Sequence, residues 1–60
     1  GGRLLLPATC DHVALYSQTG ALVAKGQNTR QLGVAGLPAG LYLLRATVRG
    51  QVLTQKVVIR

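Results

Sequence analysis

The sequence has no Phe, Trp or Met, and its 60 residues include one cysteine, one histidine and one acidic residue. A disulfide framework needs paired cysteines, and a structural zinc site needs four ligands. Both are excluded because Cys10, Asp11 and His12 are the only residues of these types. Every apolar run is far shorter than the ~20 residues that span a bilayer as a helix. Residues 3–6 are too few for the apolar region of a signal peptide, which takes ~7–15 residues. We therefore expect no transmembrane segment and no N-terminal signal peptide.

Cys10, Asp11 and His12 are also the one adjacent set that offers a nucleophile and a base. On an extended segment Cys10 and His12 share one face, while Asp11 points to the other. Catalysis also needs an oxyanion hole and a substrate pocket, which the rest of the sequence does not supply. The glycines of residues 33–40 do not follow the spacing of phosphate-binding loops. The sequence therefore predicts a non-catalytic protein without a metal or cofactor, in which Cys10 is a small hydrophobe and Asp11 a turn residue.

Seven Lys and Arg residues oppose the single acidic residue, which gives a formal net charge of +6. Such a balance favours acidic partners: nucleic acid, anionic lipid or lipopolysaccharide, or an acidic protein surface. The basic residues are scattered along the chain, however, and the sequence offers no aromatic pairs for stacking on bases. We therefore expect no nucleic-acid partner, and we interpret most of these charges as solvated strand faces or edge positions.

Apolar residues recur with a period of two, which is typical of half-buried β-strands. Within residues 41–49, for example, Tyr42, Leu44 and Ala46 fall on one face and Arg45 falls on the other. Glycines and polar clusters mark turns between such segments. We predict strands over residues 3–6 (ended by Pro7), 13–17, 21–25, 29–34, 41–49 and 52–59, with turns at 18–20, 26–28, 35–40 and 50–51. Short strands at this spacing predict an all-β antiparallel sandwich or small barrel.

Three segments, taken in order, resemble one protein family. Residues 13–23 are similar to its first hairpin, residues 37–42 to its Leu-Pro-x-Gly-x-Tyr motif, and residues 54–60 to its final strand. In that final strand a Lys precedes three β-branched residues and a basic end. Over residues 12–60 the chain thus resembles the type A C-terminal sorting domains of the type IX (Por) secretion system of Bacteroidetes. The Pro-Asn-Pro signature that opens many members is missing.

The resemblance implies a small antiparallel immunoglobulin-like β-sandwich of about six to seven short strands, forming a single domain over residues 1–60 at the C-terminus of a larger secreted protein. The implied function is a non-catalytic address label that takes an attached N-terminal cargo through the periplasm and outer membrane to the cell surface or beyond. The implied partners are the outer-membrane translocon, its shuttle protein and a sortase-type peptidase. The resemblance assigns partner recognition to Lys56, Val57, Val58, Ile59 and Arg60. It assigns structural motif roles to Gly20, Leu37, Pro38, Gly40 and Tyr42.

Physical reasoning gives several of these residues plausible tasks and leaves two other functions open. Gly40 permits a positive φ, Tyr42 suits a strand with its ring buried and its hydroxyl in water, and the last strand offers an edge for β-augmentation. An extracellular immunoglobulin-like adhesion or carbohydrate-binding module needs an exposed aromatic platform, for which only Tyr16 and Tyr42 are available. A small basic nucleic-acid-binding barrel would bind with a steep dependence on salt.

Overall fold

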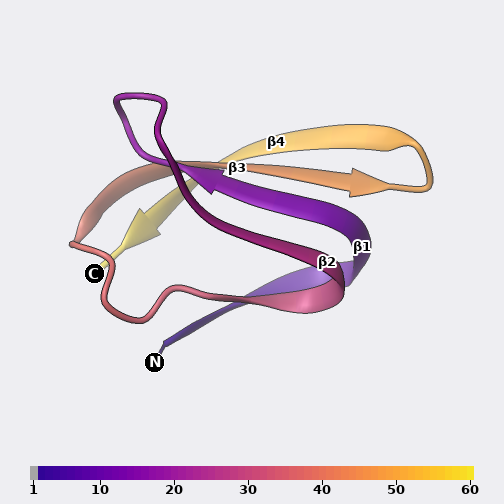
Figure 1. Ribbon diagram of the computed structural model, residues 1–60, viewed down its shortest axis with the longest axis horizontal. Coiled ribbons are helices and arrows are strands. Elements are labelled where there is room, and N and C mark those ends of the chain that lie inside the picture. The colour runs from indigo at the N-terminus through magenta and orange to yellow at the C-terminus, as the bar shows by residue number, and fades with distance from the viewer. Residues whose placement is uncertain (1) are drawn as a thin grey trace.

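The alternating apolar residues form four strands, which the computed structural model places in one antiparallel sheet. The structure describes residues 2–60. The strands are β1 (Arg3–Tyr16), β2 (Leu22–Gly33), β3 (Gly40–Val48) and β4 (Gln51–Ile59). Their order in the sheet is β2-β1-β3-β4, so β2 and β4 are the two edge strands (Figure 1).

The all-β antiparallel class predicted from the sequence is confirmed, but the immunoglobulin-like sandwich of six to seven short strands is wrong. Residues 2–60 form a single open sheet of four strands. The difference lies in the first half of the chain, where each long strand was predicted as two short ones. Segments 3–6 and 13–17 both belong to β1, and segments 21–25 and 29–34 both belong to β2.

Pro7 does not end a strand because it lies in an irregular stretch of β1. Leu5 pairs with Gln31 and Cys10 pairs with Thr29, so five residue steps on β1 oppose two on β2. Proline is tolerated at such a bulge because its missing N–H leaves no ladder hydrogen bond unmade. The strand therefore continues through Pro7 with a bend.

The predicted turn at residues 26–28 is likewise a bend within β2. Asn28 has a positive φ of 49°, a conformation that Asn adopts more readily than most residues. A Cβ on Gly26 would lie 3.1 Å from Thr29 Cγ2 and 3.4 Å from Val13 Cγ1, so the strand passes close to its neighbours there. The turn signals in the sequence are real, but they bend the strand without reversing it.

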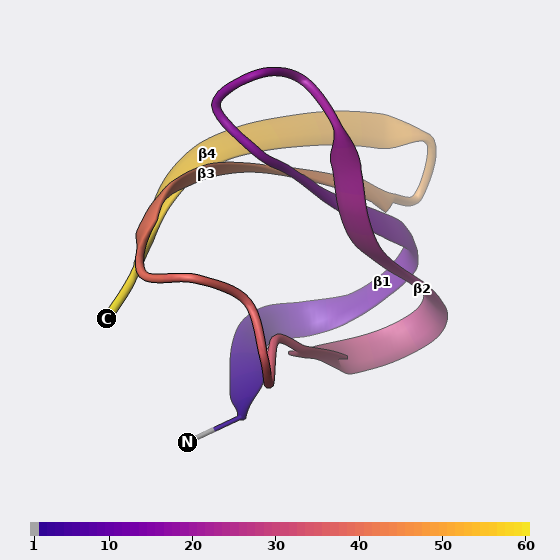
Figure 2. The same ribbon diagram turned by 60° about the vertical axis from the view of Figure 1, so that its left-hand side comes forward.

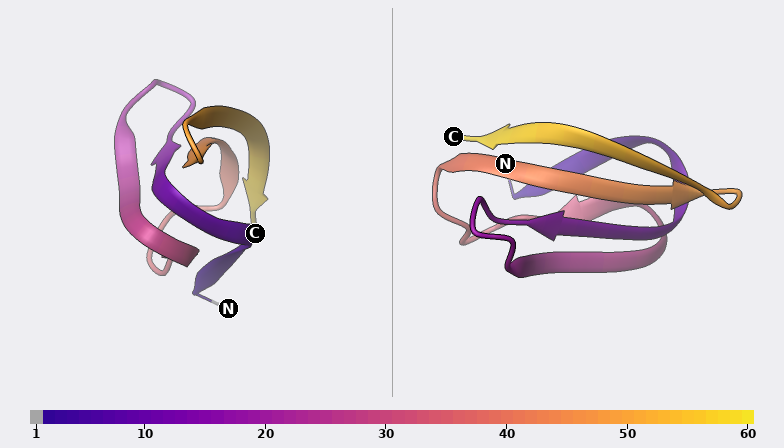
Figure 3. Two further views of the ribbon diagram at one scale, coloured as in Figure 1. Left: turned by 90° about the vertical axis from the view of Figure 1, so that its right-hand side faces the viewer. Right: turned by 90° about the horizontal axis from the view of Figure 1, so that it is seen from above.

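These bends fold the sheet over on itself. Figure 2 shows the first half of β1 and the second half of β2 lying beneath β3 and β4, and the end-on view in Figure 3 shows the same curl. The core fills the space between the two halves. Its buried residues are Leu6, Cys10, Val13, Leu15, Leu32, Tyr42, Leu44 and Ala46. One sheet thereby obtains the buried interior that a sandwich obtains from two.

The hairpin between β3 and β4 turns on two residues with positive φ. Val48 pairs with Gln51, and between them Arg49 has a φ of 52° and Gly50 a φ of 81°. Positive φ at both central positions is the signature of a type I′ turn, whose twist matches that of the flanking strands. The turn therefore lies one residue before the predicted position, 50–51.

Candidate functional site

The terminal strand β4 forms one edge of the sheet. In the described part of the chain it pairs only with β3, from Gln51 opposite Val48 to Ile59 opposite Gly40. The other side of β4 therefore presents backbone N–H and C=O groups that no strand within residues 2–60 engages. An edge of this kind can accept an added strand from a binding partner.

The five residues assigned to partner recognition divide between two faces of this edge. Val57 and Ile59 are half-buried and pack against the core. Lys56, Val58 and Arg60 are exposed, and Val58 retains 61% of its surface. The alternation of the strand thus leaves one apolar and two basic side chains free for contact and uses the other two for folding.

The motif over residues 37–42 is held together by a buried tyrosine. The Tyr42 side chain is 7% exposed, and its hydroxyl donates a hydrogen bond of 2.6 Å to the carbonyl oxygen of Pro38. The bond ties the start of β3 to the loop that precedes it, as a tyrosine corner does in β-sandwiches. Leu37 is half-buried against the core at the same place. This contact therefore joins the Pro and Tyr positions of the motif.

Gly40 begins β3 with a φ of +153°, which residues with a Cβ rarely adopt. The loop before it contains a turn in which Leu37 N donates to the carbonyl oxygen of Val34 at 3.2 Å. Gly36, with a φ of +85°, occupies the third position of that turn, as a type II turn requires. Two glycines thus give the connection between β2 and β3 its shape.

Gly20 ends the turn between β1 and β2 with a φ of +88°. Its N–H donates to the carbonyl oxygen of Ser17 at 3.0 Å, and Ser17 N donates to Ala21 O at 2.9 Å. The Ser17 hydroxyl also accepts from Ala21 N at 3.3 Å and lies 2.9 Å from the hydroxyl oxygen of Thr19. Ser17 and Ala21 thus close the turn through their backbone groups and the Ser17 hydroxyl.

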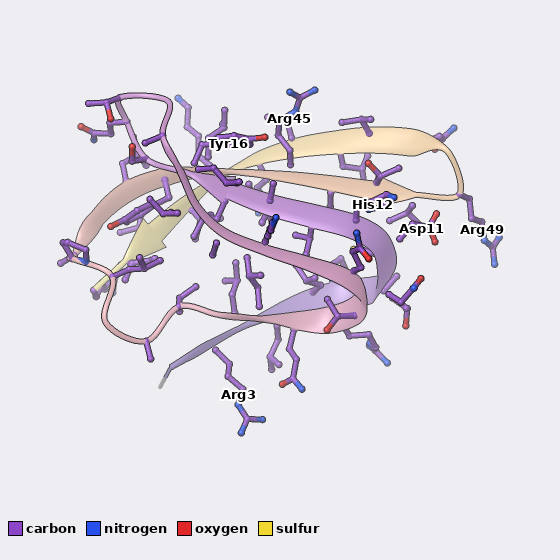
Figure 4. The ribbon with its side chains drawn as sticks, viewed as in Figure 1. Arg3, Asp11, His12, Tyr16, Arg45 and Arg49 are labelled. Carbon is purple, nitrogen blue, oxygen red and sulfur yellow. The ribbon has the colours of Figure 1, made fainter. Side chains whose placement is uncertain are left out.

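Asp11 has a role that reasoning from the sequence missed. Its Oδ2 accepts a hydrogen bond of 3.1 Å from the backbone N–H of Arg49, in the type I′ turn. Figure 4 shows both residues at the end of the molecule where β3 turns into β4. The contact spans 38 positions in sequence. No local signal predicts it, because it depends on β1 lying beside β3.

Cys10 and His12 differ in their exposure to solvent. Cys10 is buried, and its Sγ donates to the carbonyl oxygen of Ala8 at 3.4 Å, whereas His12 is exposed and pairs with Thr47 and Gln27. The interpretation of Cys10 as a small, buried hydrophobe is confirmed. The described residues therefore bring no base to the thiol.

The two alternative functions, carbohydrate binding and nucleic-acid binding, both depend on exposed aromatic rings. Tyr42 is buried with its hydroxyl bonded to the chain, so it cannot present its ring to a sugar or a base, and Tyr16 is half-buried. An aromatic platform would have to rest on Tyr16 alone.

Among residues 2–60, no helix is long and apolar enough to cross a membrane.

The comparison with known families agrees with the motifs. A family model described as the secretion system C-terminal sorting domain matches residues 5–60, which is nearly the whole chain. No curated protein and no solved structure shows a significant match. The resemblance drawn from the three segments is thereby confirmed, and the match extends to the first half of β1.

Proposed function

Because the chain belongs to the secretion system C-terminal sorting domain family, we propose that its terminal strand is the part that the export machinery reads. The function of the domain follows from the family: it is a non-catalytic sorting signal for cargo proteins of the Por, or type IX, secretion system. Such a signal implies recognition by the Por machinery and export across the outer membrane to the surface or outside.

The proposed recognition site comprises Lys56, Val57, Val58, Ile59 and Arg60. The observation that supports it best is the position of β4 at the edge of the sheet, where no strand of the described residues, 2–60, pairs with its outer side. Lys56, Val58 and Arg60 stand exposed beside that ladder. A receptor strand paired with β4 would gain main-chain hydrogen bonds along the edge and specificity from these side chains.

For the domain organisation, we propose that residues 1–60 form one sorting domain, which follows an N-terminal cargo domain in the same protein. The partners that we propose are the outer-membrane translocon, its shuttle protein and a sortase-type peptidase that removes the domain. In this scheme the domain is a substrate of the peptidase. The motif residues Gly20, Leu37, Pro38, Gly40 and Tyr42 act indirectly, by holding β3 and its neighbours in the shape that presents β4.

The test is export of a reporter fused in front of the chain in a bacterium with a Por system. Lys56→Glu combined with Arg60→Glu should leave the reporter in the periplasm, because both side chains are exposed at the proposed site. Arg3→Glu combined with Arg30→Glu changes the net charge equally and lies away from β4, so export should continue. Equal export of the two double variants contradicts the proposed site. Thermal melts of both proteins check that folding is intact.

A further inference from the structure

The outer face of the sheet, opposite the core, is basic and apolar. It carries Lys25 from β2, Tyr16 from β1, Leu43 and Arg45 from β3, and Lys56 and Val58 from β4. The only acidic residue of the chain is Asp11, whose carboxylate is engaged by the Arg49 N–H at the hairpin end. The outer face therefore has no side-chain carboxylate to neutralise its cations.

Strand pairing arranges this face in two rows across the sheet. One row runs Lys25, Ala14, Arg45, Thr54, and the neighbouring row runs Leu22, Tyr16, Leu43, Lys56. Strands lie about 4.8 Å apart, which places the backbones of Lys25 and Arg45 roughly 10 Å apart, with β1 between them. Two cations at this spacing thus stand beside a row of three apolar side chains that ends in Lys56.

The face is hollowed between these rows. Two adjoining open hollows, of about 560 Å³ and 420 Å³, are both lined by Tyr16 and Arg45. Lys25 and Leu22 also line the first, and Leu43 and Lys56 line the second. Figure 4 shows Tyr16 and Arg45 on the same side of the sheet, with Arg3 on the opposite side of the molecule. A hollowed face suits a narrow segment of protein better than it suits a flat bilayer.

We propose that this outer face binds an acidic amphipathic segment of a protein in the export machinery, an inference that rests on the proposed function. The charges favour carboxylates over Lys25 and Arg45, and the second row favours apolar side chains over Tyr16 and Leu43. An α-helix with acidic residues seven positions apart spaces them by about 10.5 Å, which matches the two cations. This contact uses side chains of the outer face, Lys56 among them, whereas strand addition uses the main chain at the β4 edge.

A direct test uses a capped, alanine-based helical peptide with two glutamates seven residues apart and leucines on the same face. The full chain should bind this probe, and affinity should fall as salt rises because the cations are exposed. Lys25→Glu combined with Arg45→Glu should weaken binding at least tenfold. The charge-matched pair Arg3→Glu and Arg30→Glu should change it less than threefold. Equal loss in both variants, or no binding of the probe by the full chain, overturns the proposal.

Two further measurements separate this proposal from its rivals. Vesicles containing one third phosphatidylglycerol should not bind the chain under conditions in which the peptide binds; binding to vesicles alone overturns the choice of a protein partner. In the export assay, Lys25→Glu with Arg45→Glu should block export of the reporter. If that variant is exported while Lys56→Glu with Arg60→Glu is not, the outer-face proposal fails and the terminal-strand proposal stands.

Discussion

Tyr42 and Gly40 show how single residues explain the motif over residues 37–42. The tyrosine contributes a buried ring to the core and a hydroxyl that bonds the Pro38 carbonyl, while the glycine gives the backbone a positive φ between them. Both were predicted from the sequence as structural residues. The acceptor of the hydroxyl was not, because the pattern predicted a hydroxyl in water.

Replacing Tyr42 by Phe should lower the free energy of unfolding by about 1 kcal/mol, because it removes one hydrogen bond and leaves the Pro38 carbonyl without that partner. Tyr16→Phe is the control, since the Tyr16 side chain is half-buried on the other face of the sheet. Urea denaturation measures both. A loss as large in Tyr16→Phe as in Tyr42→Phe contradicts the role given to the Tyr42 hydroxyl.

Replacing Gly40 by Ala should destabilise the domain by more than about 1 kcal/mol, because alanine is strained at a φ of +153°. Gly33→Ala is the matched control: Gly33 also lies in a strand, has no positive φ, and a Cβ there meets nothing within 4 Å. Thermal melting of the pair checks the prediction. If the two variants melt at the same temperature, backbone conformation does not explain Gly40.

At the scale of elements, the hairpins were predictable and the long strands were not. The period of two located β3 and β4 nearly to the residue, since the two strands pair from end to end without a register shift. In β1 and β2, Pro7 and Asn28 look like strand ends in the sequence. Whether a proline or a positive φ ends a strand or only bends it depends on the partner strand, which is set by pairing between distant residues. The edge position of β4 depends on the same pairing.

The β3–β4 turn offers a stabilising substitution. Arg49 has a φ of 52° before Gly50, and Asn-Gly is the preferred pair in a type I′ turn. Arg49→Asn should therefore raise the free energy of unfolding by a few tenths to about 1 kcal/mol. The variant keeps the backbone N–H at position 49 that donates a hydrogen bond to Asp11 Oδ2. Arg49→Lys keeps the charge without the conformational preference and should leave stability unchanged; a gain in both variants, or in neither, contradicts the turn assignment.

At the scale of the whole molecule, charge and shape divide the domain into a folding part and a presenting part. The folded-over sheet encloses its core with Leu, Val, Ala, one Tyr and one Cys, while β4 and the outer face carry exposed cations. The sequence predicted the family and the function, because three motifs in the family's order can be recognised from the residues alone. It did not predict the outer face as a surface, because Lys25, Arg45 and Lys56 come onto one face only when all four strands are paired in register.

The central claim is that this chain is a sorting signal for Por secretion, and a localisation assay of a reporter enzyme tests it most directly. The reporter carries its own signal peptide for the inner membrane, with or without the 60-residue chain behind it, in a bacterium that has the Por system. The expected result is reporter activity at the cell surface or in the medium with the chain, and in the periplasm without it or when the Por system is deleted. Reporter activity that remains periplasmic with the chain attached contradicts the account.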